Sequence, residues 1–200
     1  MRRSGRQTWR AVVSALTLAH VLGAPLQAAD EMLVPPGLQI PLIFKILTYD
    51  RELTNRVGDE LTMAVLFSSA NRDSVQARDE SLAILDKLSG KTVKTVPIRF
   101  TSVDYTSPEA LSQIIERDGI DVLYVAPGLS DHIAQVVRIS QERRIITVTG
   151  VPEYVNQGLA VGIGLRQDKP QILINLDASK QGGSVFDASL LRIAKVVAQR

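Results

Sequence analysis

The chain has 200 residues, of which 45% are hydrophobic and 22% are charged. This composition is typical of one folded globular domain with a short appendage. No cysteine occurs, which excludes disulfides, thiolate nucleophiles and sulfur-ligated metals. The formal charge of +2 is unevenly placed, because residues 1–29 hold four arginines and no acid. The remainder has 19 basic against 21 acidic residues, so it carries no electrostatic footprint for nucleic acid.

The first 29 residues have the pattern of a secretory signal peptide. An arginine-rich start precedes the apolar stretch Ala11–Leu22, and small residues follow up to Ala29. The apolar stretch is shorter than the about 20 residues that a spanning helix needs. We expect export to the periplasm with cleavage after Ala28 or Ala29. An uncleaved anchor or an amphipathic helix is the alternative.

The next segments begin the expected domain. Residues 30–37 end in Pro35-Pro36-Gly37 and predict a flexible or extended start. The dense apolar stretch Leu38–Leu47 predicts a short helix beginning near Pro41, since proline is tolerated in a first helical turn. No later stretch has 18 uninterrupted apolar residues, so no membrane span is expected after the leader.

Short apolar runs then alternate with helical patterns. The expected strands are 63–67, 93–100, 122–125 and 145–148, and the expected helices are 74–88, 107–119 and a stretch from about 130, with a turn or short helix at 152–156. Ser74 and Ser107 are suited to cap the first two of these helices. This order predicts a mostly parallel, Rossmann-like sheet in a three-layer α/β fold, with helices on both faces.

The last third of the chain predicts an antiparallel hairpin and a final helix. Two apolar runs, 159–165 and 171–176, are separated by only five residues, as in a hairpin that would form the edge of the sheet. Ser184 would cap the last helix, with Asp187 as the capping-box acid. Its apolar stripe would be Phe186, Leu190, Ile193, Ala194 and Val197. We therefore expect a single domain over residues 38–200.

Patterns that resemble catalytic motifs are incomplete. Gly90-Lys91-Thr92 resembles the end of a phosphate-binding loop, but Leu85 stands where that loop needs glycine. Ser130-Asp131-His132 holds the residue types of a catalytic triad, yet adjacent side chains point in different directions at a helix start. After the leader His132 is the only histidine, which excludes a multi-histidine metal site. The sequence predicts no enzyme and no cofactor.

Gly162 and Gly164 lie within a predicted strand and lack the third glycine of a dinucleotide-binding turn. Glycines in a strand mark a bulge or a close backbone approach. The approaching group could be a neighbouring helix or a partner chain.

The C-terminal third of the chain resembles the YfiR/HmsC-type periplasmic proteins. The resemblance is carried by residues 158–162, by Ile-Leu-Ile-Asn at 172–175 with the alanine at 178, and by the Leu190-Leu191 helix core with Ala194. Strand 122–125 and the 147–148 region fall in matching order. It covers residues 38–198, most specifically at the end. Much of this motif is suited to a structural role, because Asn175 ends a strand and can bond to the following turn.

This resemblance implies a Rossmann-like binding protein that often dimerises. The best-known members restrain a membrane-bound diguanylate cyclase by holding its periplasmic sensor domain. The present chain lacks the cysteines that some members use as redox-sensitive staples, so thiol-based sensing cannot operate.

Two hypotheses for function remain open. The leading one is a periplasmic protein that binds the outer part of a membrane cyclase or sensor kinase. Its candidate contacts lie in the apolar segment 38–49 and at the expected sheet edge 157–164, namely Leu42, Phe44, Tyr49, Gln157, Gly162 and Gly164. The alternative is a receptor for a small ligand, or an accessory substrate-binding component of a transporter. Its ligand would bind outside the carboxyl ends of the strands, near Ser68, Ser102 or Pro127.

Overall fold

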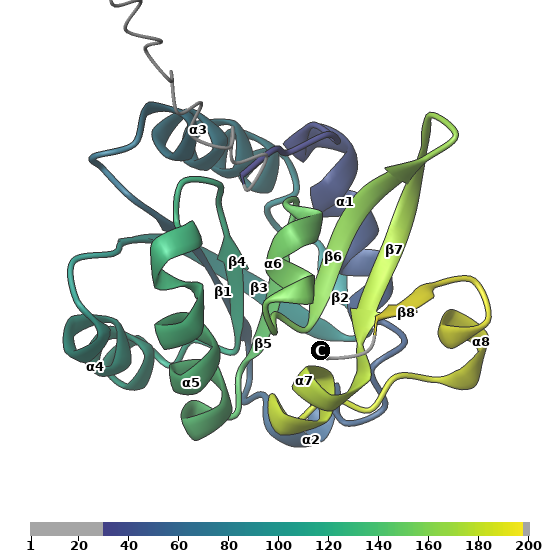
Figure 1. Cartoon of the computed structure of the whole chain (residues 1–200). Coiled ribbons are helices and arrows are strands. Elements are labelled where there is room, and N and C mark those ends of the chain that lie inside the picture. The colour runs from purple at the N-terminus through teal and green to yellow at the C-terminus, as the bar shows by residue number, and fades with distance from the viewer. Residues whose placement is uncertain (1–29, 198–200) are drawn as a thin grey trace, which may run out of the picture.

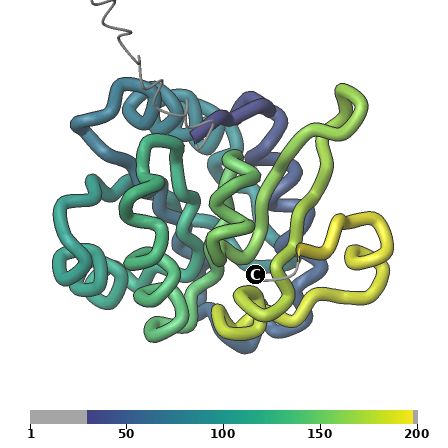
Figure 2. The backbone as a smooth tube through the Cα atoms, in the orientation of Figure 1, coloured from purple at the N-terminus to yellow at the C-terminus, as the bar shows by residue number. Residues whose placement is uncertain are grey.

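A computed structural model describes residues 30–197 of the chain. The predicted signal peptide at residues 1–29 lies outside the described residues. Figure 2 follows the backbone from the purple N-terminal helix to the yellow C-terminal segment.

A mostly parallel sheet of eight strands forms the middle layer of residues 30–197 (Figure 1). Its order is β2-β3-β1-β4-β5-β6-β7-β8. β3, β1, β4, β5 and β6 run parallel, whereas β7 is antiparallel to β6. The bounds are β1 Leu61–Phe67, β2 Thr92–Val93, β3 Val96–Asp104, β4 Val122–Val125, β5 Ile146–Thr149, β6 Val161–Arg166, β7 Lys169–Asn175 and β8 Lys195–Val197. The predicted α/β class is confirmed.

Helices cover both faces of this sheet. Their bounds are α1 Pro36–Leu47, α2 Leu53–Arg56, α3 Arg72–Lys87, α4 Pro108–Asp118, α5 Ile133–Arg143, α6 Pro152–Asn156, α7 Leu176–Gln181 and α8 Ala188–Leu191, with a 3-10 turn, η1, at Ser130–His132. Every residue of β1 is buried. Met63 and Val65 join the core under α1 and α3, and Ala64 and Leu66 join the core under α4, α5 and α6. A strand covered on both faces is apolar throughout for this reason.

Local capping explains where two of the helices begin. Ser107 accepts a hydrogen bond from the Ala110 N–H at 3.1 Å, and α4 ends at Gly119 with φ of 60°, as the sequence predicts. For α3 the prediction that Ser74 is the cap is wrong. Asn71 caps this helix by accepting from the Ser74 N–H at 3.0 Å. The Ser74 hydroxyl instead accepts from the Ser68 N–H at 2.9 Å, which ties the helix to the end of β1.

Two further elements differ from their predicted bounds. Helix α1 begins at Pro36, earlier than expected, because Pro36 occupies the favoured first position and the exposed Pro41 is tolerated within the helix. The expected strand 93–100 is two strands, since Lys94 adopts a left-handed conformation with φ of 55° and turns the chain between β2 and β3.

The predicted last helix is wrong over most of its length. Only Ala188–Leu191 is helical, and Asp187 is its cap, accepting from the Ser189 N–H at 2.8 Å. Lys195–Val197 instead forms β8, parallel to β7. The β-branched Val196 and Val197 meet an open strand edge there, and this tertiary context overrides the helical spacing. The β6–β7 hairpin is confirmed, but β8 rather than the hairpin forms the edge.

Candidate functional site

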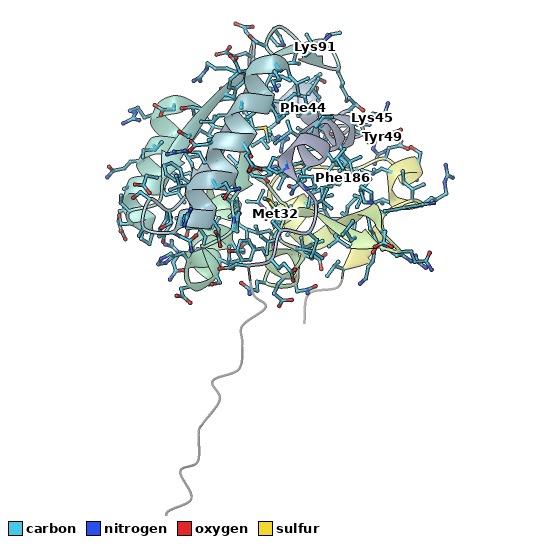
Figure 3. The ribbon with its side chains drawn as sticks, turned by 90° about the horizontal axis from the view of Figure 1, so that it is seen from above. Met32, Phe44, Lys45, Tyr49, Lys91 and Phe186 are labelled. Atoms are coloured by element: carbon cyan, nitrogen blue, oxygen red, sulfur yellow. The ribbon has the colours of Figure 1, made fainter. Side chains whose placement is uncertain are left out.

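The carboxyl ends of β1 and β4 form the place where an open α/β sheet usually binds a ligand. The chain leaves β1 for α3 on one face and leaves β4 for α5 on the other, and such a topological switch point creates a crevice. In this protein the N-terminal segment 30–35 runs beside this crevice. Its Met32 packs against the small cluster of Phe67 at the end of β1, Ala77 of α3 and Ala126 just after β4. Figure 3 shows Met32 beside the N-terminal half of α3.

Buried hydrogen bonds hold this N-terminal segment in place. Tyr124 of β4 donates to the side-chain oxygen of Gln39 at 2.8 Å, and its hydroxyl lies 3.6 Å from the Met32 sulfur. The amide nitrogen of Gln39 in turn donates to the Val34 carbonyl. Gln39 fits because residue 150 is glycine, where a Cβ atom would collide with its side chain. Gln39 therefore couples α1, β4 and the N-terminal segment.

A second tyrosine anchors the start of the segment. Tyr154 of α6 donates to the Asp30 carboxylate at 2.6 Å and accepts from the Leu129 N–H at 2.9 Å. Burial, and then the hydrogen bond to Asp30, raise the pKa of Tyr154. Burial also raises the pKa of Tyr124. Both phenols therefore stay protonated at neutral pH and act as donors.

The space that remains beside the segment is acidic. It is a cleft of about 290 Å³, and the carboxylates of Asp30, Glu31, Asp73 and Glu80 line it with Met32. Of the residues expected to hold a ligand in the receptor hypothesis, Pro127 lines this cleft, whereas Ser68 and Ser102 do not. The N–H of Ser68 donates to the Ser74 hydroxyl of α3.

The candidate contacts Leu42 and Phe44 lie on α1, and Tyr49 lies in the turn that follows this helix. Leu42, Phe44 and Tyr49 are half-buried and pack against the main core. The Lys45 ammonium lies 5.5 Å from the centroid of the Tyr49 ring, and Figure 3 shows both beside Phe44. Leu38, in the first turn of α1, is 58% exposed. The outer side of α1 thus presents a mixed apolar and cationic surface.

The other candidate contacts are dispersed. Gly162 and Gly164 are buried within β6, between β5 and β7 rather than at an edge. A Cβ atom on Gly162 would collide with Val155 of α6, and one on Gly164 would lie 3.2 Å from Pro152. The close approach predicted for these glycines therefore comes from a neighbouring helix. Of this group only Gln157, which follows α6, is exposed.

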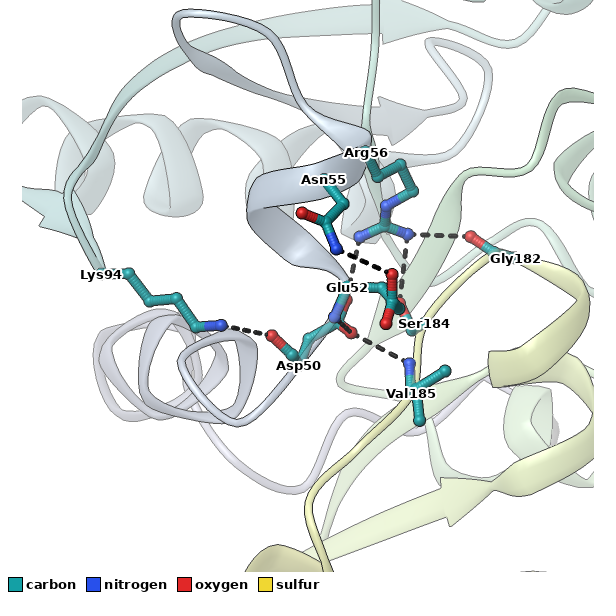
Figure 4. A network of polar contacts seen from close by, with 8 residues as sticks. All are labelled: Asp50, Glu52, Asn55, Arg56, Lys94, Gly182, Ser184 and Val185. Atoms are coloured by element: carbon teal, nitrogen blue, oxygen red, sulfur yellow. Dashed lines mark hydrogen bonds and ion pairs between the residues drawn. The ribbon is translucent and has the colours of Figure 1, made fainter.

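A buried ion pair fixes the end of α1 to the C-terminal part of the chain (Figure 4). Arg56 of α2 contacts the Asp50 carboxylate at 3.0 Å and donates to the Gly182 carbonyl at 2.8 Å and the Ser184 hydroxyl at 3.1 Å. The second Asp50 oxygen accepts from the Val185 N–H at 2.9 Å. Burial lowers the pKa of Arg56, which the charge of Asp50 opposes. These contacts position α1 and the segment leading to β8 together.

The residue types of a triad do not assemble. Ser130 donates to Asp30 at 3.4 Å, and the His132 ring stacks on Tyr105 with centroids 4.5 Å apart. Within residues 30–197 no cluster of three or more His, Asp or Glu side chains is arranged to hold a metal ion. None of the helices in that range is long and apolar enough to cross a bilayer.

Sequence reasoning missed Met32, Gln39, Tyr124 and Tyr154 as partners at the crevice. One signal was present: Gln39 is a polar residue in an apolar helix, and Tyr124 lies in a buried strand. Buried polar groups require hydrogen-bond partners. The sequence gives no indication that the two partner each other across 85 positions.

The fold and the filled crevice together define a Rossmann-like α/β domain that covers its own ligand position. A family model described as YfiR/HmsC-like matches residues 44–195. This match spans most of the chain, and the protein belongs to the YfiR/HmsC-like family. The comparison with curated proteins finds no match.

Solved structures show the same fold at low sequence identity. The ABC domain in complex with L-Trp from Streptococcus pneumonia is 16% identical with a TM-score of 0.51, over 76% of this chain and 60% of that one. A conserved domain protein from Vibrio cholerae is 13% identical with a TM-score of 0.59, over 82% of this chain and 60% of that one. The chain thus spans about three fifths of the length of these structures.

Proposed function

We propose that this protein is a periplasmic regulator that acts without catalysis, by binding the periplasmic part of a membrane-bound signalling protein. Membership of the YfiR/HmsC-like family supports a regulatory role in the periplasm. The same resemblance favours a diguanylate cyclase as the partner, with a sensor kinase as the alternative. The observation that carries the proposal is that Met32 packs at the carboxyl ends of β1 and β4, where such a fold usually binds a ligand.

Regulation of this kind works by differential binding. The domain shifts its partner between two states only as far as its affinities for these states differ. A shift from 1:99 to 99:1 needs a preference of about 10⁴-fold. A rigid surface is suited to such discrimination, and the Asp50–Arg56 network holds α1 in a fixed place relative to the C-terminal segment.

The outer side of α1 is the contact that we assign to the partner. Leu38 is exposed there, Leu42 and Phe44 lie half-exposed on the same helix, and the half-exposed Tyr49 follows two residues after its end. In this proposal Gln157 adds a contact from the region after α6. Gly162 and Gly164 act indirectly in this proposal, by letting α6 pack closely on β6.

The test uses the exported protein, fixed to a resin and exposed to solubilised envelope proteins. We expect it to retain a membrane cyclase or sensor kinase and to change the activity of that enzyme. Leu38→Glu should weaken both effects. Gln113→Glu is the matched control, since it also adds one carboxylate at an exposed helical position, on α4. Unchanged cyclase and kinase activities with the wild-type protein would refute the proposal.

A small-ligand receptor remains the second candidate. One observation favours it, namely the fold shared with a domain that was solved in complex with L-Trp. The remaining cleft is lined by carboxylates, so a ligand there would be cationic. Thermal unfolding with and without arginine and spermidine tests this candidate, and a saturable stabilisation would support it.

A further inference from the structure

The far edge of the sheet, formed by β7 and β8, has unpaired backbone. On its inner side, β7 pairs with β6 from Lys169 to Ile174. On its other side, β7 pairs with β8 only from Leu173 onward. Among residues 30–197 no strand pairs with the outer side of Lys169–Ile172 or of β8. Such an edge presents N–H and C=O groups that can accept another strand.

Apolar side chains gather at this edge. Five large hydrophobic residues are exposed within residues 30–197, and two of them lie here: Ile193 (69%) and Val196 (46%). A third, Leu165 (39%), lies on the neighbouring strand β6, opposite Pro170 of β7. A notch of about 530 Å³ opens beside β7, lined by Arg166, Gln171 and residues 192–195. Exposed apolar side chains that gather beside unpaired backbone form a surface suited to binding.

The edge is also positively charged. Arg166, Lys169, Arg192 and Lys195 are exposed, and none of them forms an ion pair with a side chain in the described part of the chain. The nearby carboxylates are Asp168 in the hairpin turn and Asp187 before α8. Positive charge is therefore in excess.

Protection against aggregation explains part of this pattern. Lysine and proline on an edge strand discourage pairing between copies, and Lys169, Pro170 and Lys195 are placed accordingly. Pairing with a second copy would bring like charges together, which disfavours a homodimer through this edge. Protection does not account for Ile193 and Val196, which are exposed in the same place.

We propose that the β7–β8 edge binds an extended, acidic segment of the partner protein as an added strand. This inference rests on the proposed function, since it names the chemistry of the partner segment. Backbone hydrogen bonds to Lys169–Ile172 or to β8 would supply affinity, as in other cases of strand addition. Carboxylates would meet the four cations, and alternate apolar side chains would cover Ile193 and Val196.

The test uses the exported protein and three synthetic peptides. The first alternates glutamate and valine over six residues, the second replaces glutamate by lysine, and the third is the acidic peptide with alternate amides N-methylated. We expect the acidic peptide to bind about tenfold more tightly than the lysine peptide, with an affinity that falls as salt rises. The N-methylated peptide should lose binding, because it cannot continue a ladder. Hydrogen exchange should slow at Ile172, whose N–H points away from β6, or at residues 195–197.

Two double variants extend the test from the peptides to the partner protein. Arg192→Glu with Lys195→Glu should abolish binding of the acidic peptide, whereas Lys87→Glu with Lys91→Glu, exposed at the end of α3, should not. Equal binding of all three peptides, slowed exchange elsewhere, or self-association through this edge would overturn the inference. If the Arg192/Lys195 variant still regulates the partner, only this inference fails. If the wild-type protein regulates no partner, both the proposed function and this inference fail.

Discussion

The same sheet is closed at one place and open at another. At the carboxyl ends of β1 and β4, Met32 and the Gln39–Tyr124 hydrogen bond fill the crevice with the chain's own residues. At the β7–β8 edge, backbone and apolar side chains remain uncovered. A small-molecule receptor that used the usual ligand position would need that crevice open, and here only the acidic cleft beside Met32 remains. The contrast favours a protein that recognises other proteins through its surface.

The largest expected effect comes from the ion pair that connects α1 to the segment before β8. Arg56→Met leaves the Asp50 carboxylate buried without its cation. Breaking one side of a buried pair costs about 3–5 kcal/mol, so the free energy of unfolding in urea should fall by that amount. The control is Arg138→Met in the exposed pair with Glu142, which should cost less than about 1 kcal/mol. Similar losses for both variants would show that the Arg56 network is not a structural anchor.

The closed crevice should be the next most sensitive region. Met32→Ala removes a partly buried side chain that contacts Phe67 and Ala126. Truncation of buried methionine costs about 2–5 kcal/mol, and we expect the lower end of this range because Met32 is only partly covered. Chemical denaturation measures the loss. An unchanged midpoint would mean that residues 30–35 do not pack in the crevice in solution.

Alkaline titration tests the burial of the two tyrosines at the crevice. The pKa values of Tyr124 and Tyr154 are raised by burial. Their contribution to stability is therefore fully present below the unfolded pKa of about 10, and it is lost as the pH rises toward the folded values. Ultraviolet difference absorbance should show that both ionise only as the protein unfolds.

The variant Tyr154→Phe lacks the hydrogen bonds to Asp30 and Leu129. Its free energy of unfolding should be lower by about 1–2 kcal/mol at neutral pH.

The open edge should respond least in stability. Ile193→Ser changes an exposed side chain, and such substitutions alter the free energy of unfolding by less than about 0.5 kcal/mol. The same variant should weaken binding of the acidic peptide. A large loss of stability in Ile193→Ser would instead mean that Ile193 is covered in solution, and the comparison between the two regions would then lose its basis.

Much of the architecture follows from local sequence patterns. The apolar run at β1 predicts a strand that is buried on both faces, and Ser107-Pro108 predicts the start of helix α4. Each of these signals lies within a few consecutive residues. The hairpin is equally local, with Gln167 and Asp168 in the left-handed conformation of a tight turn.

The rest depends on contacts between distant residues. β8 forms because Lys195–Val197 meets β7, and spacing alone favours a helix there. Met32 fills the crevice only once β1 and β4 lie side by side. The candidate contacts share this limit. The pattern places Leu42 and Phe44 on one helix, but it cannot reveal that Gly162 and Gly164 lie beneath α6.

The most direct measurement of the central claim is the affinity of the purified protein for the periplasmic domain of the membrane enzyme that it retains, compared between Leu38→Glu and Met32→Ala. Binding through the surface predicts that Leu38→Glu weakens the affinity by at least about tenfold, or 1.4 kcal/mol, and that Met32→Ala leaves it nearly unchanged at a temperature where both variants are folded. A loss confined to Met32→Ala would contradict the account and assign recognition to the crevice.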